Sequence, residues 1–191
     1  MNASYALPRA PSGASVTWNW ARWAALGADD VYDFLALRSE VFHVEQHVAG
    51  QPSGFLDVDG CDRSAWHLLG RATDASSGSM LVTYLRLVDP GIKFREPSIG
   101  RVITRATRRG AGLGRALMRE GLARAAVVWP HRPIRIGAQH RLVAFYASLG
   151  FAAVGEPYQE DGIAHIEMLH PMHDGGVTVA PRSRVEETIA P

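Results

Sequence analysis

Three glycines lie among small and apolar side chains in the segment RRGAGLG, residues 108–114. Because glycine has no β-carbon, the backbone N–H groups of such a segment can approach an anion closely. The amphipathic sequence LGRALMREGLARAAVV begins within this segment and predicts a helix, whose N-terminus adds partial positive charge. The segment therefore predicts a phosphate-binding turn, with Arg108 and Arg109 available to meet further phosphate charge.

Two common phosphate-binding loops do not fit this spacing. The dinucleotide-binding pattern G-x-G-x-x-G/A requires Gly or Ala where this chain has Arg115 or Leu117, depending on the register. A P-loop requires a lysine, and Lys93 is the only lysine of the chain. The pattern [QR]-x-x-G-x-[GA] between a strand and a helix does fit residues 109–114. A turn without any ligand stays an alternative for this segment.

Other polar clusters are weaker candidates for chemistry. The segment HVEQH at 43–47 places two histidines four residues apart without the H-E-x-x-H order, so a helix end is favoured over a zinc site. The segment DVDGCD at 57–62 resembles the start of a calcium loop, but Asp62 stands where that loop requires glycine. We expect it to shape a loop or to contact a cationic substrate. Nothing nearby in the sequence activates the single Cys61, and no metal is expected.

Predicted strands and helices alternate along the chain and would position these residues. Turn signals and the periodicity of apolar residues predict strands at 16–23, 65–72, 79–88, 99–106, 134–138, 151–158 and 163–169, and helices at 31–46, 113–128 and 139–150. We expect Asp29 and Asp30 to cap the first helix and Gly150 to end the last. This order predicts one α/β domain over residues 16–172, with a mixed sheet of about six to seven strands flanked by helices. Residues 1–15 are expected to be loose, and residues 173–191 form a tail without a sustained period.

Composition narrows the class of protein further. The chain has 191 residues, 47% of them hydrophobic, which suits one domain with a real core. The net charge of +1 gives no overall field for nucleic acid or an anionic membrane, so neither is expected as a partner. One cysteine excludes an internal disulfide, and the N-terminal residues do not resemble a signal peptide. A cytoplasmic protein is expected.

A second segment, residues 139–151, helps to interpret the glycine segment at 108–114. Residues 139–151, QHRLVAFYASLGF, resemble the N-x-x-A-x-x-x-Y-x-x-x-G-F segment of the GNAT superfamily of acyl-CoA N-acyltransferases, with Gln139 in place of Asn and Leu142 in place of Ala. The order of elements resembles this superfamily over roughly residues 16–172. Within it, the chain is similar to the ElaA-like group through the segments 38–46 (RSEVFHVEQ), 57–62 (DVDGCD), 99–102 (IGRV) and 158–168 (YQEDGIAHIEM).

The resemblance implies acetyl-CoA as the cosubstrate and a sheet that is splayed open around it. Pantetheine would lie along the strand before the glycine segment, pyrophosphate on the backbone amides of that segment, and the thioester near the helix that follows. The residues that the resemblance implies for acetyl-CoA binding are Val102, Ile103, Thr104, Arg108, Arg109, Gly110, Ala111, Gly112, Leu113, Gly114, Gln139 and Tyr146.

The transfer of an acetyl group from a thioester to an amine requires a neutral amine, a polarised carbonyl and a proton for the thiolate. Tyr146 matches the family tyrosine that protonates the thiolate as a general acid; its other interpretation is a core aromatic. The strand before the glycine segment has no carboxylate, so the general base must come from elsewhere or be a chain of water molecules. The candidate bases are Glu45, Glu160, Asp161, His67 and His165.

We therefore expect an acetyl-CoA-dependent N-acetyltransferase that acts directly on a primary amine of a small molecule, which the sequence does not identify. A non-catalytic acyl-CoA-binding or sensing domain is the alternative, motivated by the missing strand carboxylate and the substituted Asn. Plain nucleotide binding through the glycine segment is a third. Such domains often pair, so a homodimer is one expected state.

Overall fold

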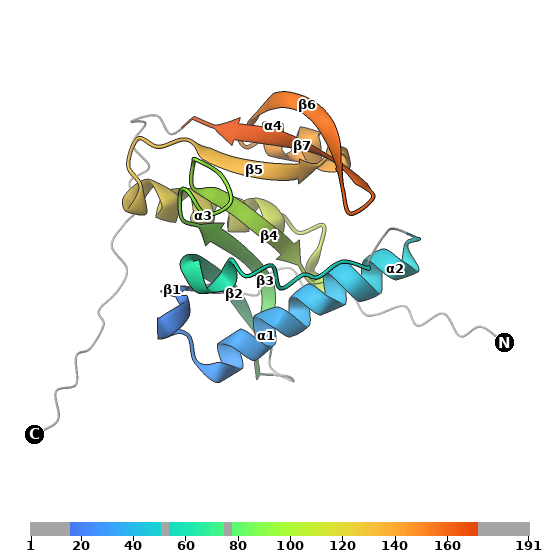
Figure 1. The fold of residues 1–191 in the computed structure, drawn as a ribbon. Helices are drawn as coiled ribbons and strands as arrows, with labels where there is room; N and C mark the ends of the chain where they lie inside the picture. The colour runs from blue at the N-terminus through green and yellow to red at the C-terminus, as the bar shows by residue number, and fades with distance from the viewer. Residues whose placement is uncertain (1–15, 51–53, 75–77, 172–191) are drawn as a thin grey trace, which may run out of the picture.

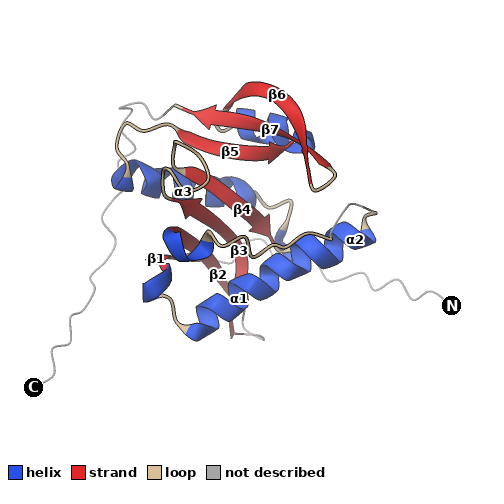
Figure 2. Ribbon diagram, viewed as in Figure 1, coloured by secondary structure: helices blue, strands red, loops and turns tan. Residues whose placement is uncertain are grey.

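A computed structural model of the chain describes residues 16–50, 54–74 and 78–171. Seven strands form one sheet in the order β1-β2-β3-β4-β5-β7-β6, shown in Figures 1 and 2. Only the β4–β5 pair is parallel, so the sheet is mixed, as predicted. The strands are β1 Val16–Arg22, β2 Ala65–Asp74, β3 Gly78–Val88, β4 Ser98–Thr104, β5 Ile134–Gln139, β6 Ala152–Glu160 and β7 Ile163–His170.

Helices cover both faces of this sheet (Figure 2). The first helical segment comprises α1 Ala28–Ser39, a π-helical stretch Glu40–Glu45, and α2 Gln46–Val48. The long helix α3 Leu113–Val128 lies on the opposite face, and the short helix α4 Val143–Ala147 follows β5. The predicted order of strands and helices is therefore confirmed.

Two helix ends differ from the predictions. Gly27 is the N-cap of α1, so the prediction that Asp29 and Asp30 cap it was wrong. These two aspartates lie in its first turn instead, where a negative charge is favoured by the helix dipole. The helix predicted over 139–150 is shorter, because β5 extends to Gln139 and a 3₁₀ turn precedes α4. Gly150 ends the segment with a φ of 94°, a conformation that glycine adopts without strain.

Strand β3 is the centre of the core. All its residues from Leu81 to Val88 are buried, and alternate side chains serve opposite faces. Tyr84 packs in the cluster beneath α1, with Phe34 and Leu37. Leu85 packs in the cluster beneath α3, with Leu117 and Met118. Because both faces are covered, β3 and its neighbours form a fixed base for the more open strands.

Strands β4 and β5 diverge almost at once. Ser98 and Arg135 are their only paired residues, next to a hydrogen bond of 3.0 Å from the Arg135 amide to the Pro97 carbonyl. Beyond this point, β4 pairs with β3 alone and β5 with β7 alone. The predicted splay of the sheet is therefore confirmed, and it exposes the inner edge of each strand to a ligand.

None of the described helices is long and apolar enough to cross a membrane.

Two side chains pack directly on the backbone of Gly70 in β2, and this contact gives a test of the core. A β-carbon at Gly70 would lie 2.4 Å from Thr83 Cγ2 and 2.6 Å from the Trp18 ring. We expect Gly70→Ala to reduce the free energy of unfolding by about 1–3 kcal/mol, because the packed core must shift to admit the methyl group. Thermal unfolding would show this as a melting temperature about 2–4 °C lower per kcal/mol. Gly54→Ala is the control, because its β-carbon would contact nothing within 4 Å; equal effects of both substitutions would contradict this account.

Candidate active site

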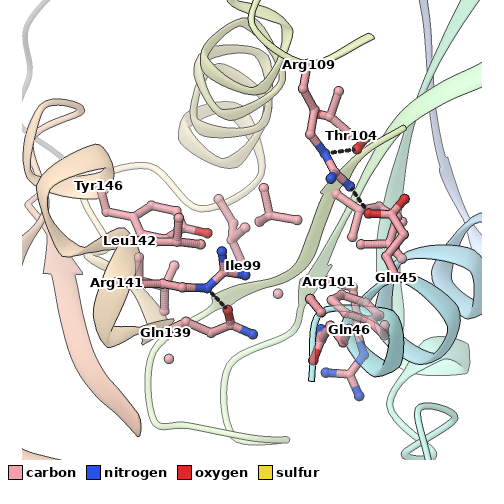
Figure 3. A pocket seen from close by; sticks show the side chains of 18 residues that line it. Glu45, Gln46, Ile99, Arg101, Thr104, Arg109, Gln139, Arg141, Leu142 and Tyr146 are labelled. Carbon is pink, nitrogen blue, oxygen red and sulfur yellow. Dashed lines mark hydrogen bonds and ion pairs between the residues drawn. The ribbon is translucent and has the colours of Figure 1, made fainter. Parts of the chain in front are cut away.

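A cavity of about 430 Å³ fills the opening between β4 and β5. One wall consists of β4 and the helical segment that includes Glu45 and Gln46. The other wall consists of β5 and the start of α4, with Gln139, Leu142 and Tyr146 (Figure 3). We call this space the first cavity.

The first cavity brings together half of the residues implied for acetyl-CoA binding. Its lining includes Val102, Ile103, Thr104, Arg109, Gln139 and Tyr146. Six others are not among its lining residues, since they form the turn into α3 beside Arg109: Arg108, Gly110, Ala111, Gly112, Leu113 and Gly114. A ligand that contacts all twelve would therefore extend from the cavity across this turn.

The turn into α3 has the conformation and the space that an anion requires. Gly110 and Gly112 have φ angles of 82° and 80°, and Gly112 is the N-cap of α3. A β-carbon on either glycine would meet nothing within 4 Å, so the space outside the turn is open. The glycines thus serve the turn, as the alternative interpretation holds, and also leave room for a phosphate at a helix N-terminus. The residues present fit the pyrophosphate of an acyl-CoA.

Arg109 folds over the inner edge of β4. Its Nε donates a hydrogen bond of 2.8 Å to the Thr104 carbonyl, and its Nη2 lies 2.6 Å from Glu45 Oε2 (Figure 3). Glu45, a predicted base candidate, is therefore held by a cation at the end of the cavity toward the α3 turn. This contact places Arg109 beside the space that a phosphate would occupy.

Tyr146 is a core aromatic residue that also lines the first cavity. Its ring is part of the core and forms T-shaped contacts with the rings of Phe145 and Phe151. Only 7% of the residue is exposed, and its hydroxyl points into the first cavity (Figure 3). Burial raises the pKa of Tyr146 to about 12, so the hydroxyl stays protonated and able to donate near neutral pH.

A second cavity of about 490 Å³ meets the first. Its outer walls come from the loop before β2, the loop between β3 and β4, and the β6–β7 turn. The two cavities share seven lining residues, which we call the junction: Phe42, Gln46, Ile99, Gly100, Arg101, Gly137 and Gln139. A donor bound in one cavity and an acceptor bound in the other would meet there.

The second cavity holds three of the predicted base candidates. Glu160, Asp161 and His165 all line it, and all come from the β6–β7 hairpin. Glu160 Oε1 lies 3.5 Å from the Lys93 ammonium. His165 Nδ1 donates a hydrogen bond of 2.8 Å to the Ile163 carbonyl, so in the neutral ring Nε2 is the nitrogen with the lone pair.

The fifth base candidate, His67, does not belong to this site. It is fully buried, stacks on Phe34 and lines neither cavity. Its ring nitrogens are hydrogen-bonded to the Tyr84 hydroxyl at 2.8 Å and the Asp62 carbonyl at 2.9 Å. Burial lowers the pKa of His67, which keeps the ring neutral as a structural group.

A buried ionic cluster forms the support behind the junction. Its closest contacts are Arg38–Asp57 at 2.6 Å, Arg38–Asp62 at 2.7 Å, Arg86–Asp59 at 2.6 Å, Arg86–Asp62 at 2.8 Å and Arg101–Asp57 at 2.6 Å. The three aspartates belong to the segment DVDGCD, and the arginines come from α1, β3 and β4. The aspartates are therefore paired within the protein and shape the loop, which was one of the two roles expected for this segment. They do not form a free anionic site for a cationic substrate.

Arg101 links this cluster to the backbone of β4. Gly100 and Ile103 pair with Arg86 and Tyr84, so two residues of β4 lie opposite one of β3 and form a β-bulge. Arg101 lies in this bulge with a φ of 54°, a conformation that a non-glycine residue adopts only at a cost. Its ion pair with Asp57 holds the bulge at the junction.

Among the described residues, no three His, Cys, Asp or Glu side chains lie close enough together to hold a metal ion. His43 of the HVEQH segment instead packs its ring against Phe55, at 5.2 Å between ring centroids.

Sequence reasoning assigned no role to Gln46, Arg101 or Gly137, which all lie at the junction. Gln46 and Arg101 were inside segments quoted for the resemblance, so the signal was present without a function. Gly137 lies inside a short apolar strand and has no local signal.

Comparison with known proteins gives matches to an acetyltransferase domain family and to two curated relatives. A family model described as "Acetyltransferase (GNAT) domain" matches residues 75–170. A UPF0039 protein of Synechocystis sp. is 40% identical over 154 residues, which cover 81% of this chain and 94% of that protein. Protein ElaA of Escherichia coli is 37% identical over 153 residues, covering 80% and 95%.

Two solved structures are also similar to this chain in fold and sequence. An acyl-CoA N-acyltransferase from Pseudomonas aeruginosa has a TM-score of 0.72 and 37% identity, covering 82% of this chain and 99% of that one. Escherichia coli ElaA has a TM-score of 0.71 and 34% identity, with the same shares covered.

The ionic cluster gives a test by pH. Burial disfavours the Asp62 carboxylate, but the charges of Arg38 and Arg86 outweigh it and hold the pKa of Asp62 below its usual value. The carboxylate therefore stabilises the fold above about pH 4, and this contribution is lost as the pH falls toward the lowered pKa. We expect Asp62→Asn to reduce the free energy of unfolding by about 3 kcal/mol at pH 7, because two buried arginines lose a shared partner.

Denaturant unfolding at pH 7 and at pH 3 would measure the effect, with a smaller difference between Asp62→Asn and the unchanged protein at pH 3. Glu156→Gln, an exposed carboxylate on β6, is the matched control and should change stability by less than about 0.5 kcal/mol. A loss at Asp62 no larger than at Glu156 would show that the cluster contributes little.

Proposed function

The chain belongs to the GNAT acetyltransferase family, and we propose that it is an acetyl-CoA-dependent N-acetyltransferase that acts directly on a primary amine of a small molecule. The supporting observation is the meeting of two cavities at one junction, where β4 and β5 have diverged. One cavity borders a turn suited to phosphate, and the other is lined by groups that can bind and deprotonate an amine. Direct transfer needs such an arrangement, because it brings the two reactants together without a covalent enzyme intermediate.

The first cavity is proposed to hold the pantetheine arm and the thioester. The inner edge of β4 along Val102–Thr104 offers backbone groups that no strand pairs on that side, although those of Ile103 face Tyr84 of β3. The turn from Gly110 to Gly114, together with Arg109, is proposed to bind the pyrophosphate. An N–H group of the β4 bulge would then polarise the thioester carbonyl, because the bulge directs backbone groups away from the ladder with β3.

The proposed chemistry requires one bond to form and one to break. The lone pair of the neutral amine attacks the thioester carbonyl carbon, a C–N bond forms, and the C–S bond then breaks. Tyr146 donates the proton that the leaving thiolate requires, which suits a hydroxyl kept protonated by burial. The amine loses one proton, for which Glu160 and His165 are the proposed acceptors from the second cavity. No carboxylate belongs to the junction, so a water molecule would relay this proton.

The second cavity is proposed to bind the rest of the acceptor. Its outer wall includes Leu56 and Ile92, which are 79% and 52% exposed. Burial of these side chains by a ligand would be favourable. Glu160 and Asp161 lie on the β6–β7 side of the same space. An amine with an apolar substituent suits this combination better than a polyamine, because the aspartates of the loop are already paired with arginines.

The competing hypothesis is an acyl-CoA-binding domain without catalysis, which the absence of a carboxylate at the junction motivates. A catalytic domain releases the free thiol of CoA when it acetylates an amine, whereas a domain that only binds acyl-CoA does not. Turnover with any member of a panel that includes 2-phenylethylamine, benzylamine, ethanolamine and spermidine, with the acetylated product identified by mass, would exclude the binding-only function. Acetyl-CoA binding without product from any amine would favour it.

We predict that a negative charge in the glycine turn weakens acetyl-CoA binding. Ala111→Glu would place a carboxylate beside the proposed pyrophosphate position, and the repulsion should raise the dissociation constant about tenfold or more. Ala126→Glu is the matched control, because it adds the same charge at an exposed position near the other end of α3. Calorimetric titration of both variants measures this. No binding by the unchanged protein at millimolar acetyl-CoA would refute the proposed function.

Tyr146→Phe is expected to reduce kcat by about 10²- to 10⁴-fold, because the thiolate loses its proton donor. The dissociation constant of acetyl-CoA should stay the same within about twofold, since the ring that packs in the core is kept. Tyr32→Phe removes a hydroxyl from an exposed residue of α1 and serves as the control. Thiol release with the best amine of the panel measures kcat, and an unchanged value in Tyr146→Phe would rule out the assigned role.

A further inference from the structure

Gln46 occupies a place at the junction that the reaction described so far does not use. It is the first residue of α2, directly after the π-helical stretch Glu40–Glu45. Its side chain lines both cavities, and only 6% of the residue is exposed. In Figure 3 it lies on the same wall as Arg101, with Gln139 and Tyr146 on the opposite wall.

The Gln46 side chain has an unsatisfied hydrogen-bond acceptor. Its Oε1 is buried and has no hydrogen-bond partner among the described residues. Buried polar atoms in folded proteins are nearly always paired, and an unpaired one has lost water without replacement. The side chain that carries this unpaired oxygen lines both cavities, so a ligand with a donor group at the junction would supply the missing partner.

The other polar side chains of the junction are engaged. Gln139 Oε1 accepts a hydrogen bond of 2.9 Å from Arg141 Nε. The guanidinium of Arg101 is paired with Asp57 and Asp59. Among the junction residues, Gln46 Oε1 is therefore the side-chain acceptor that has no hydrogen-bond partner at all.

We propose that Gln46 Oε1 accepts a hydrogen bond from the N–H of the acceptor amine and selects primary over secondary amines. This inference rests on the proposed function, because it requires an acyl donor in the first cavity. A carboxamide does not take up a proton near neutral pH, so Gln46 orients the nitrogen lone pair and does not act as the base.

The selection follows from counting hydrogens. A neutral primary amine has two N–H bonds, of which one is lost as a proton during transfer. The other remains on the product amide and can stay hydrogen-bonded to Gln46 throughout the reaction. A secondary amine has a single N–H, which must leave, so its product would leave Gln46 Oε1 unpaired again.

Two CoA conjugates test this without knowledge of the natural acceptor. In the amide probe, the CoA sulfur bears CH₂–C(O)–NH–butyl, so that an N–H lies at the junction and the butyl group enters the second cavity. The ester probe has oxygen in place of this N–H and is otherwise identical. We expect the full-length protein to bind the amide probe about tenfold more tightly than the ester probe, because only the amide donates to Gln46.

Two variants separate hydrogen bonding from packing. Gln46→Met keeps the length of the side chain but lacks the carboxamide oxygen, and it should bind both probes with equal affinity. Gln46→Glu keeps an acceptor oxygen in the same place, and it should retain the preference for the amide probe. A residue that serves only packing would give the same probe ratio in all three proteins.

The dissociation constant of unmodified CoA is the control, and it should differ by less than about twofold among the three proteins. Equal binding of the two probes by the unchanged protein would overturn the role of Gln46, even if Gln46→Met fails to fold. A preference that survives in Gln46→Met would overturn it as well. CoA binding without probe discrimination leaves the proposed function intact, whereas no CoA binding at all defeats both.

Discussion

The structure depends on the single residue pair that joins β4 to β5. A sheet that opens in the middle needs a strong connection where its halves still meet, and Arg135 supplies it. Its guanidinium pairs with Glu96, before β4, at 2.8 Å and with Glu167 of β7. Helix α3 packs across β3 and β4, while Ile134 and Ile136 of β5 belong to the same apolar cluster as α3. The two halves are thus fixed at one end and free to receive a ligand at the other.

The ionic cluster around Asp62 holds the irregular strand β4 and the loop that contains the DVDGCD segment in place beside the second cavity. Buried ion pairs add little net stability compared with apolar packing, because the charges must be desolvated. They do restrict geometry, since each arginine must meet its carboxylate in one orientation. Arg38, Arg86 and Arg101 come from three different elements, so the cluster locks α1, β3 and β4 to one loop. The strained backbone of Arg101 depends on that constraint.

Local patterns were sufficient to predict the seven strands, the long helix α3 and the glycine turn, because alternation, helical periodicity and glycine spacing are properties of short segments. The arginine partners of the DVDGCD segment could not be predicted from local patterns, since Arg38 and Arg101 lie 19 and 44 residues from Asp57. His67 looked like a base because the sequence does not tell which face of a strand is buried. Gln46 had no predicted role, because its significance depends on two cavities that distant strands create. The family resemblance led to the expectation of an acyl-CoA, and the structure showed two cavities that meet at the junction.

The π-helical stretch between α1 and α2 sets where the number of residues in this helical segment matters. A π-helix has more residues in each turn than an α-helix, and such turns are frequent at functional sites. A return to α-helical winding between Ser39 and Gln46 would absorb the loss of one residue there, so Glu45 and Gln46 would keep nearly their present direction. The same loss within α1 would turn each following side chain by about 100° around the helix axis. The cavity wall therefore tolerates a one-residue deletion in the π-helical stretch that it would not tolerate in α1.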